Sequence, residues 1–184
     1  MQFRPTSIPA VIEITPHLIS DPRGYFFESF RKSVFAENGI SEDFVQENQS
    51  WSSGGTLRGL HFQIAPHAQS KLVRCLHGSI FDVAVDIRPQ SPTFGQWVSC
   101  TLSAELNNAL YIPTGFAHGF YVLSDTATVS YKCGVFYNRE SERSLRWNDP
   151  TINIAWPIDP KHPPLLSEKD LNAPLFSKDV FTSL

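Results

Sequence analysis

Short segments with the composition of β-strands follow one another through the middle of this 184-residue chain. Residues 72–76 and 79–87 are rich in apolar and β-branched side chains and flank the dipeptide His77-Gly78, which predicts a β-hairpin. Further strand-like runs cover residues 96–102, 109–112, 119–123 and 128–136, and turn residues rich in Pro, Gly, Ser and Asp separate them. Many short strands with regular turns are typical of a sandwich or a barrel, so we expect an all-β fold.

The second of these runs alternates in polarity. One face of the strand would carry Phe81, Val83, Val85 and Ile87, and the other Ile80, Asp82, Ala84 and Asp86. The apolar set is expected to pack in the core. Asp82 then lies on the opposite face, where it could border a ligand cavity.

Helical signals are few. Ser33 is placed to cap a short helix that runs through Asn38 and ends at Gly39. Prolines interrupt the C-terminal third, yet this segment carries Trp147 and Trp156, so we expect it to pack on the barrel. The length suits a single domain over residues 1–184, with a core at about residues 45–140 and with N-terminal strands and the Pro-rich C-terminal segment packed on it.

Composition excludes several classes of partner. The formal net charge is -3 and no Lys/Arg run stands out, so no nucleic-acid partner is expected. No apolar stretch reaches the length of about 18 residues that a membrane span needs, and the first residues do not resemble a signal peptide. Cys75, Cys100 and Cys133 lack metal-binding spacing and are expected as small apolar side chains in a cytoplasmic protein.

Four segments, which we call patches, contain side chains suited to catalysis or ligand binding. They are residues 56–63 with Arg58 and His61, residues 70–74 with Lys71, residues 112–120 with His118, and residues 131–137 with Tyr131. Each has an ordinary structural interpretation when it is taken alone. A histidine is more often a hydrogen-bonded structural residue, a lysine at a strand start is usually a solvated edge charge, and an aromatic residue in a strand is usually core.

The spacing of Pro113, Gly115 and His118 resembles the second signature of cupin jelly rolls. Metal-binding cupins also carry an upstream His-x-His, whereas this chain has His61-Phe62-Gln63. The ammonium of Lys71 lies near the place where a carboxylate ligand would be wanted, and it would repel a divalent cation. We therefore expect a cupin-type jelly-roll barrel with a few short helices and no metal.

The patches together resemble the dTDP-4-dehydrorhamnose 3,5-epimerase family. The resemblance covers most of the chain, in residues 21–29, 44–48, 57–63, 71–75, 81–88, 91–97, 112–120 and 166–170. It implies a dTDP-linked 4-keto-6-deoxy-hexose as substrate and no cofactor. The C4 ketone acidifies the protons on C3 and C5, so the reaction needs a base, a partner for the enolate oxygen and an acid on the opposite face.

The resemblance also implies roles for individual residues. His61 would be the base and Asp170 would orient it, while Lys71 would stabilise the enolate and Tyr131 would return a proton. The sugar and phosphates would be held by Arg58 and His118. Nucleotide-binding positions match at Arg23, Glu28, Gln46, Asn48, Glu142 and Lys169, and Tyr137 matches an aromatic that stacks on thymine. Family members are dimers in which N-terminal residues reach the partner subunit, which would make Arg23 and Glu28 crossing residues.

Some alternatives stay open at this point. Asp170 follows Ser167 by three residues, which is also the spacing of a helix capping box, and Glu142 on its own is a loop charge. Ile19 stands where family members often carry a Phe that contacts the base. Besides a 3,5-epimerase, the chain could be a mono-epimerase that inverts C3 or C5 only, a metal-dependent cupin enzyme, or a sugar-nucleotide binder without catalytic activity.

Overall fold

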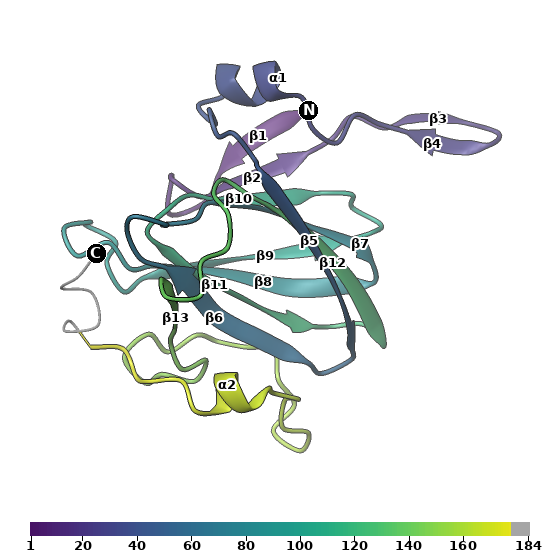
Figure 1. Cartoon of the computed structure of the whole chain (residues 1–184). Coiled ribbons are helices and arrows are strands. Elements are labelled where there is room, and N and C mark those ends of the chain that lie inside the picture. Colours follow the sequence, from purple (N-terminus) through teal and green to yellow (C-terminus); the bar gives the residue numbers. More distant parts are fainter. Residues whose placement is uncertain (178–184) are drawn as a thin grey trace.

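A computed structural model describes residues 1–177, and residues 178–184 of the expected domain lie outside it. Two antiparallel sheets face each other in a jelly-roll barrel (Figure 1), which confirms the all-β fold expected from the strand pattern. The six-stranded sheet has the order β1 (Gln2–Pro5), β2 (Ile12–Thr15), β10 (Ala109–Ile112), β7 (Lys71–His77), β12 (Thr126–Cys133) and β5 (Gln46–Ser53). The five-stranded sheet has the order β13 (Glu142–Ser144), β6 (Leu57–Gln63), β11 (Phe116–Val122), β8 (Ser79–Asp86) and β9 (Trp97–Ser103).

Both faces of β8 are buried. Ile80 and Ala84 belong to the core between the two sheets, and Asp82 is fully buried on the same strand. Val83 and Val85 belong to a second core, in which the C-terminal segment packs through Ile152, Ile154 and neighbouring side chains. The face that we expected to be core is therefore the one that the C-terminal segment covers.

The expected hairpin over residues 72–87 is wrong. Strand β7 pairs with β10 and β12, whereas β8 pairs with β11 and β9, so the chain crosses from one sheet to the other at Gly78. Gly78 has a φ of +74°, and a Cβ atom there would lie 2.1 Å from the carbonyl oxygen of Thr126. A glycine between two strands marks a tight reversal, but it does not say whether the strands then share a sheet.

The helix expected near residue 33 is present, but its expected cap is wrong. Helix α1 spans Lys32–Glu37, its N-cap residue is Arg31, and no side chain caps it. Packing stabilises it instead: the ring of Phe35 is fully buried and lies 4.7 Å from that of Phe30 and 5.3 Å from that of Phe3. A second short helix, α2 (Glu168–Leu171), lies in the C-terminal segment, as expected.

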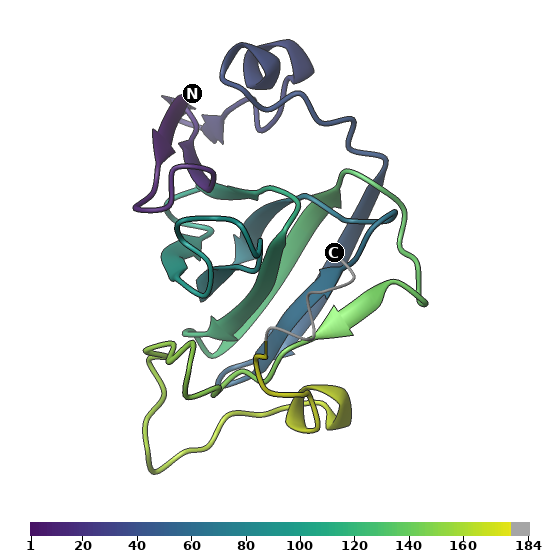
Figure 2. The same ribbon diagram turned by 90° about the vertical axis from the view of Figure 1, so that its left-hand side faces the viewer.

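The N-terminal elements and the C-terminal segment lie at opposite ends of the barrel (Figure 2). The C-terminal segment is anchored by Trp156, whose indole nitrogen donates to the carbonyl of Trp147 at 2.8 Å and whose ring packs 5.9 Å from that of Phe81. In contrast, strands β3 (Ile19–Asp21) and β4 (Gly24–Phe26) form a hairpin that projects from the barrel (Figure 1), with every residue of both strands exposed. None of the helices in residues 1–177 is long and apolar enough to cross a membrane.

Candidate active site

A cavity of about 320 Å³ opens where strands from both sheets meet. Strand β6 contributes side chains from one sheet, and β5, β7 and β12 contribute from the other. The cavity brings together seven of the side chains expected in the site from the sequence: Gln46, Asn48, His61, Lys71, Tyr131, Tyr137 and Glu142.

A histidine–carboxylate pair lies at this cavity. The Nε2 atom of His61 is 2.5 Å from Oδ1 of Asp170, whose side chain is only 3% exposed. Burial acts to raise the pKa of Asp170, but the hydrogen bonds from His61 and Ser167 outweigh it and hold the pKa below its usual value. Asp170 is therefore a carboxylate at neutral pH, and it fixes both the orientation and the tautomer of the imidazole.

The helix cap at Ser167 and the His61–Asp170 pair, which the sequence left open as alternative roles for Asp170, are both present. Ser167 is the N-cap residue of α2; its hydroxyl accepts from the Asp170 backbone N–H at 3.1 Å and donates to Oδ2 of Asp170 at 2.9 Å. The other carboxylate oxygen remains for His61. Helix α2 therefore orients the carboxylate of Asp170 toward His61 on β6.

Close packing at a glycine positions His61 on its strand. Gly59 has a φ of +122°, and a Cβ atom there would lie 2.5 Å from the Cα atom of Gly119 on β11. The pairing of β6 with β11 shifts register between His118 and Phe120, beside this contact. Only glycine tolerates both the conformation and the approach, so a local irregularity is built into the strand that carries His61.

Lys71 contributes a cation without a carboxylate partner. Among the described residues, no carboxylate lies within ion-pair distance of its Nζ atom, which lies 5.8 Å from the centre of the Tyr131 ring. Burial lowers the pKa of Lys71, and the surrounding groups, Cys133 foremost, oppose this shift only in part. An ammonium in this state is well placed to interact with a negative charge that forms in the cavity.

Tyr131 faces the cavity from β12, whereas His61 comes from β6 in the opposite sheet. Burial raises the pKa of the Tyr131 phenol above its usual value, and Cys133 adds to the effect. The phenol therefore stays protonated at neutral pH. A base, a free cation and a protonated acid from the opposite wall are the groups needed to move protons on and off carbon beside a ketone.

His118 lies behind the cavity wall. It is 6% exposed and its Nε2 atom is 2.6 Å from Oδ1 of the fully buried Asp82. Burial lowers the pKa of His118, although the charge of Asp82 works against this shift. The partner of His118 could have been found in the sequence, because an Asp that alternates with apolar residues in a buried strand needs a hydrogen-bonding group.

A second polar group forms the mouth of the cavity. The carboxylate of Glu142 accepts from the Tyr137 hydroxyl at 3.1 Å and pairs with Nζ of Lys169 at 2.6 Å. The backbone N–H of Tyr137 donates to the side-chain oxygen of Gln46, whose amide in turn donates to Asn48. The expected nucleotide-binding residues of the barrel are therefore connected to one another.

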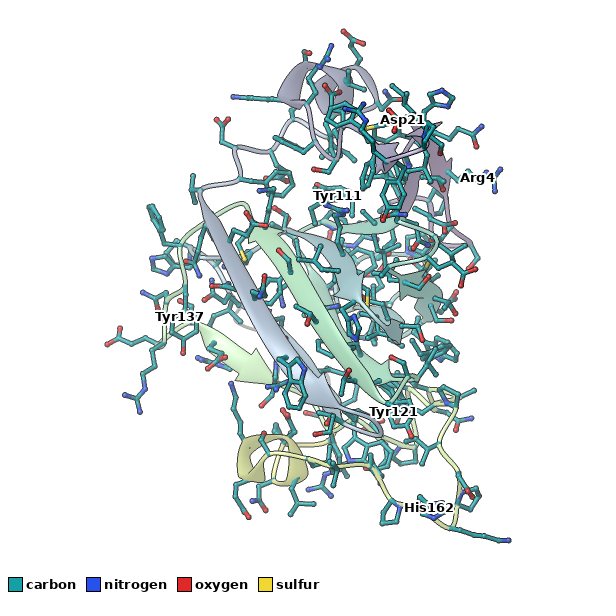
Figure 3. The ribbon with its side chains drawn as sticks, turned by 90° about the vertical axis from the view of Figure 1, so that its right-hand side faces the viewer. Arg4, Asp21, Tyr111, Tyr121, Tyr137 and His162 are labelled. Atoms are coloured by element: carbon teal, nitrogen blue, oxygen red, sulfur yellow. The ribbon has the colours of Figure 1, made fainter. Side chains whose placement is uncertain are left out.

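Besides Asp170, His118 and Lys169, three more of the expected residues are not among those that line the cavity. Arg58 donates to the Ser52 hydroxyl at 3.0 Å and to the backbone of Trp51. Arg23 pairs with Asp21 in the projecting hairpin, and Glu28 pairs with Arg31. Figure 3 shows Asp21 far from Tyr137, so the hairpin of this chain does not reach the mouth of its own cavity.

The cavity also has lining residues that sequence reasoning did not assign: Phe62, Gln63 and Gln69. Gln63 had been noted only as the residue that replaces a cupin metal ligand. The sequence did contain a signal for Gln63. It lies two residues after His61 in a strand, and side chains two apart on a strand share a face, so Gln63 should face the same cavity as His61. Within residues 1–177, no group of three or more His, Cys, Asp and Glu side chains is arranged to hold a metal ion.

Comparison with known proteins agrees with this geometry. The family model described as dTDP-4-dehydrorhamnose 3,5-epimerase matches residues 5–178. A dTDP-4-dehydrorhamnose 3,5-epimerase of Shigella flexneri is 54% identical over 172 residues, which are 93% of each chain.

Solved structures agree as well. A dTDP-4-dehydrorhamnose 3,5-epimerase from Elizabethkingia anophelis superposes with a TM-score of 0.93 at 49% identity, over 98% of each chain. An epimerase from Legionella pneumophila, solved with dTDP-4-keto-L-rhamnose, gives 0.90 at 48% identity over 95% of this chain and 92% of that one.

A 3'-monoepimerase from Streptomyces bikiniensis is also similar, with a TM-score of 0.86 at 40% identity, over 94% of this chain and 86% of the other. The match of the family model along almost the whole sequence, and relatives at about half identity, identify this chain as a member of the dTDP-4-dehydrorhamnose 3,5-epimerase family.

Proposed function

We propose that this chain converts dTDP-4-dehydro-6-deoxy-D-glucose to dTDP-4-dehydro-L-rhamnose by exchanging the protons at C3 and C5. The observation that carries the proposal is the His61–Asp170 pair in a cavity whose opposite wall holds Tyr131. Relatives at about half identity carry the name of this reaction, and one is solved with a keto-rhamnose nucleotide. The chain is accordingly an isomerase.

The ketone of the substrate supplies the activation, so the mechanism that we propose uses no cofactor. His61 removes the proton from the carbon beside the ketone, and the electron pair of the C–H bond moves onto the ketone oxygen to form an enolate. Lys71 stabilises the enolate oxygen, because its ammonium has no carboxylate partner within ion-pair distance in residues 1–177. Tyr131 then gives its proton to the same carbon from the other side, which inverts the stereocentre.

Asp170 and Tyr131 are in the protonation states that the reaction requires at neutral pH. Asp170 is ionised, so the protonated imidazole that forms during the reaction is stabilised. The pKa of Tyr131 is raised, so the phenol holds a proton to donate. After inversion at one carbon, the base and the acid exchange protons with water and repeat the step at the other carbon.

The mouth of the cavity binds the nucleotide in this proposal. Tyr137 is 53% exposed and presents a free ring face on which thymine can stack. Gln46, Asn48, Glu142 and Lys169 surround it with polar atoms. Arg58 and His118 lie next to the cavity and contribute to holding the sugar and phosphates.

The functional unit that we propose is a homodimer. Arg23 lies in the turn of the β3–β4 hairpin, which projects from the barrel (Figure 1), and Glu28 follows this hairpin; neither residue lines the cavity of its own chain. An isolated two-stranded hairpin is at best marginally stable in water, so its exposed Ile19 and Phe26 need a partner surface. We place the protein in the cytoplasm, which agrees with three unpaired cysteines.

The test is to incubate the protein with its proposed substrate in D2O and to follow the label by NMR. Deuterium at both C3 and C5, with the L-rhamno product, is the expected result. No incorporation at either carbon would show that the chain is not an epimerase of this substrate. His61→Ala is the matched control and should remove exchange while it leaves nucleotide binding in place.

A mono-epimerase is the second candidate, since one similar solved protein is a 3'-monoepimerase. The same base, cation and acid serve one inversion or two. Deuterium at one carbon only, with a product inverted at that carbon alone, would show that the chain is a mono-epimerase. The same isotope experiment therefore decides between the two.

A further inference from the structure

We infer that Gln63 and Gln69 are positioning residues for nucleotide binding, because their amides hold the loop that carries Tyr137 against the cavity. The inference rests on the proposed function and deepens it at the nucleotide end of the same site. With Gln46, whose side chain binds the Tyr137 backbone N–H, they form what we call the glutamine clamp.

Gln63 is the centre of the glutamine clamp. It is 6% exposed, and its Nε2 atom donates to the carbonyl of His67 at 2.7 Å and to that of Phe136 at 3.4 Å. Its Oε1 atom accepts from the backbone N–H of Asn138 at 2.7 Å. One buried amide thus connects two loops and binds the backbone on both sides of Tyr137.

Gln69 holds the start of the same loop. Its Nε2 atom donates to the carbonyl of Val135 at 2.9 Å. The three glutamines therefore bind four successive residues, from Val135 to Asn138, through the backbone alone. Backbone contacts of this kind fix where the Tyr137 side chain projects without using any part of that side chain.

The loop depends on such contacts because its aromatic rings do not pack in the core, and among the described residues the side chain of Tyr137 hydrogen-bonds only to Glu142 at the mouth of the cavity. Phe136 is 68% exposed and Tyr137 is 53% exposed, so neither buries its ring in the protein. Figure 3 shows Tyr137 at the outer edge of the barrel, beside β13. A stacking ring on a loop held only by its ends would lose conformational freedom on binding, and a ring already in place avoids that entropic cost.

The position of Gln63 has a chemical logic. Metal-binding cupins place a histidine at the corresponding point of the His-x-His signature, where it would face the barrel interior. A neutral amide offers a donor and an acceptor together, which an unmetallated imidazole also does but with a shorter reach and a single donor. In this chain the residue binds the loop backbone instead of a ligand.

The clamp is tested by a double-mutant cycle on dTDP affinity, measured by calorimetry with Gln63→Ala, Tyr137→Ala and the double variant. Tyr137→Ala and Gln63→Ala should each weaken dTDP binding about tenfold. If the clamp acts through Tyr137, Gln63→Ala should cost less than about twofold once Tyr137 is removed. Full additivity of the two changes would overturn the inference.

Further variants separate the clamp from a loss of folding. Gln69→Ala should show the same coupling to Tyr137 from the other end of the loop, and a thermal melt of each variant reports its stability. Gln90→Ala is the matched control, since Gln90 is exposed and has no hydrogen bond among the described residues. With substrate, the variants should raise KM while they leave kcat nearly unchanged, whereas a distorted barrel would also lower kcat.

The outcome also distinguishes this inference from the proposed function. Isotope exchange with wild-type protein combined with additive mutations would reject the clamp alone. Coupled mutations without isotope exchange would keep the clamp and reject the epimerase. A wild-type chain that binds no dTDP would overturn the clamp together with the nucleotide site.

Discussion

At the scale of single residues, the carboxylate of Asp170 does two things at once. One oxygen binds the cap hydroxyl of Ser167 and the other binds His61. Asp170→Asn keeps the size of the side chain but removes its charge and disturbs the tautomer of His61. It should lower the rate of deuterium exchange by about 10³–10⁴-fold, as in other His–carboxylate pairs.

The control for this change is Ser167→Ala. It removes the cap hydroxyl and should destabilise the protein by about 1 kcal/mol, but it leaves the carboxylate in place. Its exchange rate should therefore fall far less than that of Asp170→Asn. Equal rates in the two variants would show that the charge on Asp170 is not needed.

Lys71 predicts how the reaction depends on pH. Its pKa lies below the ordinary lysine value of 10.5, so the ammonium loses its proton, and its charge, earlier as the pH rises. As the pH is raised, the rate of deuterium exchange should therefore begin to decrease at a pH below 10.5. A fall that begins below pH 10.0 is not due to Tyr131, because burial raises the pKa of this phenol above its ordinary value of 10.0.

Lys71→Arg provides the check, since a guanidinium stays protonated to a pH of about 12 or more. The variant should exchange deuterium more slowly at neutral pH, because a guanidinium group differs in shape from an ammonium group. Its exchange rate should show no decrease as the pH approaches 10.5. A decrease at the same pH in wild-type and variant would assign the titration to another group.

At the scale of secondary-structure elements, the transfer of the chain between sheets at Gly78 is the most constrained point. Gly78→Ala would add a Cβ atom 2.1 Å from the carbonyl oxygen of Thr126 and 2.3 Å from the Ser124 hydroxyl, at a φ of +74°. The free energy of unfolding should fall by about 3 kcal/mol or more, because backbone must move to make room. Urea denaturation measures this loss.

Gly39→Ala is the comparison, because Gly39 has a similar φ of +83° but no atom within 4 Å of the added Cβ. It should cost only about 1 kcal/mol, which is the strain of the conformation itself. Equal losses at both glycines would mean that the contact at Gly78 is unimportant.

At the scale of the whole molecule, the projecting hairpin predicts complementation between two inactive chains. Arg23→Ala damages the hairpin, and His61→Ala damages the cavity. If the hairpin serves the partner subunit, a mixed dimer contains one site with both residues intact. Random mixing should then restore about one quarter of wild-type activity, measured below KM.

The result is compared with each variant alone, both of which should be nearly inactive under these conditions. Light scattering during size exclusion gives the mass, expected at twice the 20.7 kDa of one chain. A mixture no more active than its components, or a monomeric mass, would contradict the proposed dimer.

The sequence predicted much of the fold and much of the cavity. The alternation of polarity along residues 79–87 located β8 and placed Asp82 opposite to Val83. The order of short motifs brought Asp170 into consideration, although the residue lies 109 positions from His61. The roles carried over from the family stay predictions until the variants are measured.

The features that the sequence did not predict depend on which strands pair and on contacts between distant segments. The exchange of partners after Gly78 and the bond between Asp82 and His118 follow from the register of β8 against β11, which no local pattern encodes. The N-cap of α1 was misplaced because buried aromatic rings, and not a cap, determine where that helix begins. The role of Gln63 was missed because its partners belong to two loops without regular patterns.

The separation of His61 and Asp170 along the chain has a consequence for biosynthesis. The ribosome completes all the strands of the barrel before it adds α2, because β13 ends at Ser144 and Asp170 is 26 residues further on, counting from 144 to 170. A nascent barrel could therefore already present His61, Lys71 and Tyr131, but its imidazole would lack the carboxylate. Catalytic competence is thus postponed until the segment after β13 has been synthesised and has packed on the barrel.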